Sequence, residues 1–188
     1  MSFDAAAVRK ELEDSGNSLV WEVETLWKLL KENDFYGDTR HWPMAHYAFM
    51  MACFARIDLL SRYWEGTNAD QTLRMRRFML KYMYPGKDKE VAIAIKLWRH
   101  GLMHTAEPRM ILISNTETKV ANLLHFGDWL PKEQHFTLIE GAYEVLNMAV
   151  TFFAADVRDA LGRYLDDLED SEDLQAKYLT IGASEFTG

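Results

Sequence analysis

Apolar residues recur every three or four positions along the last third of the chain, and this period limits the folds open to it. The residues of the period are Ile139, Tyr143, Leu146, Val150, Phe153, Val157, Leu161 and Leu165. They extend over about seven helical turns. Glycine and proline, which interrupt helices, number only 10 and 4 in 188 residues. The chain is therefore expected to fold mainly into long helices.

The same period predicts further helices over residues 3–33, 43–64, 70–84 and 88–104. Within the first, Ser, Gly and Asn at 15–18 predict a break after a short leading helix, because these residues favour helix caps. In the second, residues 47–55 are apolar on every side. A helix of that kind is usually buried, so Met50 and Met51 are both expected in the core.

A short β-rich run at 109–114, a turn at 115–118 and a second run at 119–126 predict a small hairpin. We therefore expect an all-α fold: an antiparallel bundle of four or five main helices, with a β hairpin inserted before a long C-terminal helix. No linker divides the chain, which predicts one domain over 1–188. Its core would span about 18–166, followed by an acidic extension over 166–188.

The formal charge is −8, and six of the negative charges lie in one block, so the rest of the chain carries −2. That block contains Asp166, Asp167, Glu169, Asp170, Glu172 and Asp173. A nearly neutral body gives weak support for broad nucleic-acid affinity. The block itself predicts either a solvated helix end or a docking site for a basic protein partner. With no signal peptide and no membrane-length apolar run, we expect a cytoplasmic protein that does not enter a membrane.

One segment, RHGLMH at 99–104, combines an arginine with two histidines at the end of a predicted helix. Arg99 is suited to hold a phosphate and His104 to transfer a proton near neutral pH. The alternative is a helix C-terminus at which basic side chains cap the last carbonyls. On a regular helix, five residues separate the two side chains by ~140°. They converge only if the helix loosens near Gly101.

His100 and His104 lie four residues apart, the spacing of helical zinc ligands, but two ligands are too few for a zinc site. We therefore expect no metal and no cofactor. Arg74, Arg77 and Lys81 share one face of the third helix, which predicts either a phosphate-binding stripe or an ordinary solvated face. Asp58 is expected to pair with Arg62 four residues on, or with a buried cation such as Arg99.

These segments resemble a HEPN-like domain, a helical superfamily with an Arg-x4–6-His motif near the end of a core helix. The resemblance covers roughly residues 20–165. It depends on Arg99 and His104 at this spacing, on FARIDLL at 54–60 and on RFMLKY at 77–82 before Tyr84 and Pro85.

The resemblance implies metal-independent RNA cleavage of the kind used in stress response, toxin–antitoxin systems or defence. Arg99 would stabilise the phosphate, His104 would be the general acid or base, and two motifs would face each other in a homodimer. His100 occupies a position that is often asparagine or another polar residue, and Asp58 is a second accessory candidate. The superfamily also contains non-catalytic members. A nucleotide- or RNA-binding module and a helical protein-interaction subunit therefore stay open as alternatives.

Overall fold

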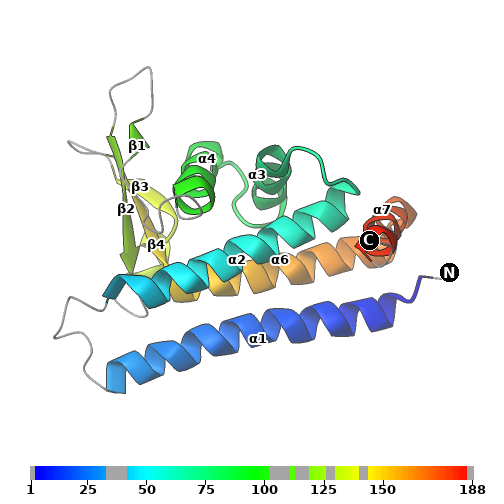
Figure 1. Cartoon of the computed structure of the whole chain (residues 1–188), viewed down its shortest axis with the longest axis horizontal. Helices are drawn as coiled ribbons and strands as arrows, with labels where there is room; N and C mark the ends of the chain where they lie inside the picture. Colours follow the sequence, from blue (N-terminus) through cyan, green and yellow to red (C-terminus); the bar gives the residue numbers. More distant parts are fainter. Residues whose placement is uncertain are drawn as a thin grey trace.

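The computed structural model describes residues 3–32, 42–101, 111–112, 119–125, 130–139 and 144–185. Three long helices run side by side through the molecule: α1 (Ala5–Glu32), α2 (Trp42–Glu65) and α6 (Val150–Asp170). Helix α1 runs in the opposite direction to α2 and α6 (Figure 1). The prediction of a helical bundle with a β insertion before the C-terminal helices is confirmed.

Shorter helices complete the bundle. Helices α3 (Gln71–Tyr82) and α4 (Asp88–Ala94) pack on one side of α2. Helix α7 (Glu172–Glu185) crosses the end of the bundle far from the sheet (Figure 1). Apolar side chains from all these helices form one core, in which Val23, Ile57, Phe78 and Phe153 have no exposed surface. None of the described helices is long and apolar enough to cross a membrane.

Helix α1 continues through residues 15–18, so the predicted break is wrong. The reason is a close approach between helices. A Cβ atom on Gly16 would lie 2.7 Å from Leu161 Cδ2, so glycine here lets α1 approach α6. The sequence signal that we interpreted as a break marks a helix–helix contact.

The β part is a four-stranded sheet in the order β1-β2-β4-β3, larger than the predicted hairpin. The hairpin itself is present, because β1 (Ile111–Leu112) pairs antiparallel with β2 (Lys119–His125). Strand β4 (Glu144–Ala149) then lies parallel to β2 and antiparallel to β3 (Thr137–Ile139). The long helix predicted from residue 139 therefore begins only at Val150.

Helix α2 is less buried than its sequence predicted. Met50, Cys53, Phe54 and Ile57 face the core, but Met51 is 43% exposed. Over residues 48–55 the exposed side chains are nevertheless all apolar. They are Ala48, Met51, Ala52 and Ala55.

Candidate functional site

The helix that carries the Arg99 motif changes its geometry at Ile95, four residues before the motif begins. Helix α4 runs regularly from Asp88 to Ala94 and continues as a π-helix over Ile95–Gly101. Arg99 and His100 are part of this π-helix, whereas His104 lies outside the described residues. π-Helical geometry is rare, and the single-turn π-bulges in which it mostly appears are frequent at functional sites.

Local sequence explains why this helix is held in place. Asp88 and Glu90 occupy its first turn, where negative side chains favour the N-terminus of a helix. Val91, Ile95 and Trp98 follow at helical spacing and are buried, with Trp98 only 1% exposed. The helix packs on α2 and α3 along one side and on β4 beyond it. The motif therefore follows a well-anchored segment where the bundle meets the sheet.

A π-helix bonds residue i to residue i+5, so one turn takes roughly four to five residues. Side chains five apart, which diverge by ~140° on an α-helix, come close to alignment when this wider turn continues. This wider turn is present in the backbone up to Gly101, and residues 102–104 lie outside the described part of the chain.

A second polar cluster, which the sequence did not reveal, joins the loop after α3 to α6. The hydroxyl of Tyr84 donates to Asp156 Oδ2 over 2.7 Å, and His135 Nε2 lies 3.1 Å from the same oxygen. His135 Nδ1 accepts from the Ala149 amide at 3.0 Å. A neutral imidazole therefore carries its proton on Nε2 and donates it to Asp156.

Both ring nitrogens of His135 are engaged, and the ring is buried. Burial, and then the negative charge of Asp156, raise the pKa of Tyr84 well above its usual value, so the hydroxyl stays protonated. The cluster fastens the loop, β4 and α6 to one another, and offers no free proton acceptor on the imidazole. No sequence signal points to it, because its members lie 21 to 72 residues apart.

Arg74 does not belong to a phosphate-binding stripe or a solvated face. Its side chain is 2% exposed, and Nη2 donates to Asp58 Oδ1 over 2.6 Å. Its Nε and Nη1 donate to the Ser61 hydroxyl and the Ala69 carbonyl. Asp58 thus takes Arg74 as its cation partner, and its other oxygen accepts from Gln71.

The other two predicted phosphate ligands, Arg77 and Lys81, do lie together in an open groove of about 680 Å³ between α3 and the α6–α7 corner. Each already faces a carboxylate: Arg77 pairs with Glu65 at 3.3 Å and Lys81 with Asp167 at 2.7 Å. Asp170 and Asp173 line the same groove. A phosphate entering it would meet four carboxylates, which disfavours the predicted role.

The acidic block forms the corner between α6 and α7, and much of its charge is neutralised from within the chain. Arg9 of α1 binds both Asp166 and Glu169. Asp167 binds Lys81, and Asp173 binds Lys177 on the next turn of α7. A basic partner docking here would have to displace these cations.

Within the described residues, no three His, Cys, Asp or Glu side chains gather as metal ligands would. Comparison with known protein families, with curated proteins and with solved structures gave no match.

Proposed function

We propose that the chain is a metal-independent endoribonuclease of the HEPN type, with Arg99 and His104 as its catalytic residues. The observation that carries the proposal is the π-helix over Ile95–Gly101, because it widens the turn where Arg99 lies. The buried α4 segment before it supplies a rigid support for this turn. The expected helical bundle around the motif supports the same assignment.

In this mechanism His104 takes the proton from a ribose 2′-hydroxyl, and the 2′-oxygen attacks the adjacent phosphorus. The bond to the 5′-oxygen breaks, and that oxygen leaves with a proton from an acid or from water. Arg99 donates two hydrogen bonds to the phosphate oxygens as negative charge builds on them. His100, on the same π-helix, is an accessory candidate for supplying the second proton.

The test incubates purified protein with mixed RNA in excess chelator, beside Arg99→Ala and His104→Ala variants. Lys96→Ala is the matched control, because Lys96 is an exposed cation on the same π-helix. We expect the wild type and Lys96→Ala to cleave, and each motif variant to lose at least about 100-fold in rate. RNA with 2′-deoxy sugars should resist cleavage.

Equal loss of RNA with the wild type and with the Arg99→Ala and His104→Ala variants would overturn the proposal, as would cleavage only when a divalent metal is present. Binding without cleavage, weakening as salt rises, would instead favour the non-catalytic RNA- or nucleotide-binding alternative. Circular dichroism of each variant separates loss of chemistry from loss of folding.

A further inference from the structure

Arg56, on α2, is a half-buried cation whose charge no carboxylate of the described residues balances. Its Nη2 donates across to the Ser15 hydroxyl on α1. Five other arginines pair with a carboxylate: Arg9, Arg74, Arg76, Arg77 and Arg158. Arg163, which is exposed, donates to the Tyr82 carbonyl. Arg56 differs from these arginines in being half-buried with a neutral hydroxyl as its partner.

This arrangement is costly for an isolated chain. Burial disfavours the charged guanidinium and lowers the pKa of Arg56. A guanidinium offers five N–H donors in a planar fork that fits a carboxylate with two hydrogen bonds. A carboxylate supplied from outside the chain would compensate the charge that Ser15 leaves unbalanced.

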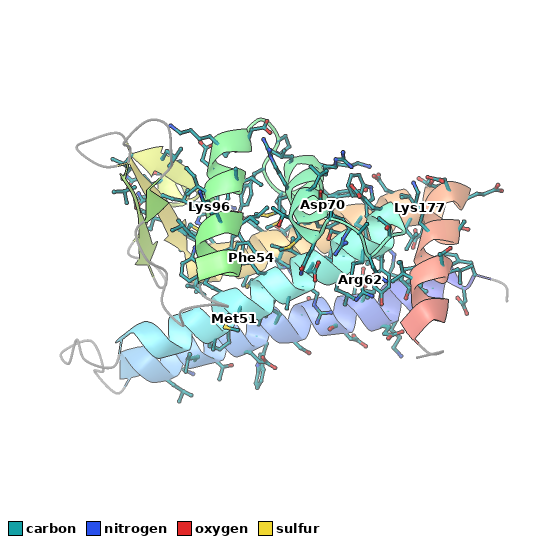
Figure 2. The ribbon with its side chains drawn as sticks, turned by 45° about the horizontal axis from the view of Figure 1, so that its top comes forward. Met51, Phe54, Arg62, Asp70, Lys96 and Lys177 are labelled. Carbon is teal, nitrogen blue, oxygen red and sulfur yellow. The ribbon has the colours of Figure 1, made fainter. Side chains whose placement is uncertain are left out.

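The surface beside Arg56 is apolar. Ala48, Met51, Ala52 and Ala55 are the exposed side chains of α2 over residues 48–55, and Figure 2 shows Met51 on the α2 surface beside α1. Arginine and methionine are enriched in the buried centres of protein interfaces. The face combines both with small residues that allow close approach.

The same face carries the opposite charge. Ser15, which receives the Arg56 hydrogen bond, marks the edge of α1 that lies toward α2. Glu11 and Glu22 lie four residues before it and seven after it, at helical spacing on that edge. Both are exposed, and neither forms an ion pair among the described residues. The face thus presents an unbalanced cation on one helix and unbalanced carboxylates on the other, which makes it complementary to itself.

We propose that the α1–α2 face binds a second copy of the chain, with Arg56 of each copy pairing with a carboxylate on α1 of the other. A two-fold arrangement makes each such pair twice, as isologous interfaces do. Helix α4 lies across α2 from α1 (Figure 1). Association through this face therefore leaves the two Arg99 motifs apart, unlike the facing motifs that the HEPN resemblance implies. The inference does not depend on ribonuclease activity.

The experiment measures the mass of the full chain in solution by sedimentation, without RNA, up to about 1 mM protein. We expect the wild type to dimerise, and Arg56→Glu to weaken the dimer at least about 30-fold. Met51→Glu, a change at an exposed position that leaves the core intact, should weaken it as well. Arg158→Glu is the matched control, since Arg158 is an exposed arginine on α6, and it should dimerise like the wild type.

A charge exchange tests the pairing itself. The double variant Glu11→Arg/Glu22→Arg should be monomeric alone, as should Arg56→Glu, whereas a mixture of the two should form heterodimers. A wild type that stays monomeric overturns the proposal, and so does a dimer that survives Met51→Glu and Arg56→Glu. A mixture that fails to associate, with both variants folded by circular dichroism, also contradicts it. None of these results depends on cleavage, so either proposal can fail alone.

Discussion

Arg74 and Asp58 form an ion pair of 2.6 Å inside the helical bundle, with the arginine side chain 2% exposed and the aspartate 25% exposed. The pair links α2 to α3, and Ser61 and the Ala69 carbonyl satisfy the remaining guanidinium groups. Arg74 therefore holds α2 and α3 together. Its position in the sequence had predicted a place on the surface of the third helix.

Removing Asp58 would leave the Arg74 charge buried and uncompensated. We expect Asp58→Ala to lower the free energy of unfolding by about 3 kcal/mol, measured by urea denaturation. Arg76→Ala, which breaks the exposed pair with Asp88, should cost at most about 1 kcal/mol. Equal losses in the two variants would show that the buried pair has no special role.

Gly66 ends α2 at a φ of +71°, and a Cβ there would lie 2.9 Å from Lys177 Cβ. Gly86 has a similar φ of +79° but nothing within 4 Å of the same position. Both Gly→Ala variants should lose about 1 kcal/mol from the left-handed backbone. Gly66→Ala should lose additional stability, because the new Cβ would push against Lys177 and α7 would have to shift. The difference between the urea midpoints of the two variants therefore measures the contact between Gly66 and α7.

Asp167 should make stability depend on pH in the acid range. Hydrogen bonds from Lys81 and then from Tyr82 hold the pKa of its carboxyl below the ordinary 3.8. A carboxyl with a lowered pKa stabilises the fold above its unfolded-state pKa, and this contribution is lost as the pH falls through the folded-state value.

As the pH falls from about 5 to about 2, the urea midpoint of Asp167→Asn should therefore decrease less than that of the wild type. Asp170→Asn, in the same groove, is the control and should follow the wild type. A parallel loss in wild type and Asp167→Asn would contradict the linkage.

Arg99→Lys keeps a positive charge on the π-helix but removes the two-point contact that a guanidinium makes with phosphate. We expect RNA cleavage to fall by at least about tenfold, with unchanged circular dichroism. His100→Ala separates the accessory role from a passive one. A rate close to wild type would show that His100 supplies no proton.

The helical bundle was predictable because the spacing of apolar residues and the positions of helix-breaking residues are local features of the sequence. The prediction of 43–64, for example, differs from α2 by one residue at each end. Strand β4 was not predictable in this way. Leu146, Asn147 and Met148 are all buried, so the strand shows no alternation, and its apolar residues fit a helical period equally well. Pairing with β2, more than twenty positions earlier, decides its conformation.

The candidate site likewise has a part that the sequence predicted and a part that it did not. The Arg99 segment stood out because its residue types lie close together in sequence. The partners of Arg74 and His135 come from other elements, and nothing local distinguishes a buried arginine from an exposed one. The π-helix has no sequence signature that we used, since its apolar residues Ile95 and Trp98 also fit an α-helix.

The packing of α1 on α6 joins two segments separated by more than a hundred residues. During synthesis α1 leaves the ribosome well before α6, with Leu12, Leu19 and Val23 still lacking their native cover. The apolar stripe of α1 therefore stays without α6 to cover it until most of the chain has been made. This late closure favours slow folding and gives chaperones a defined segment to protect in the meantime.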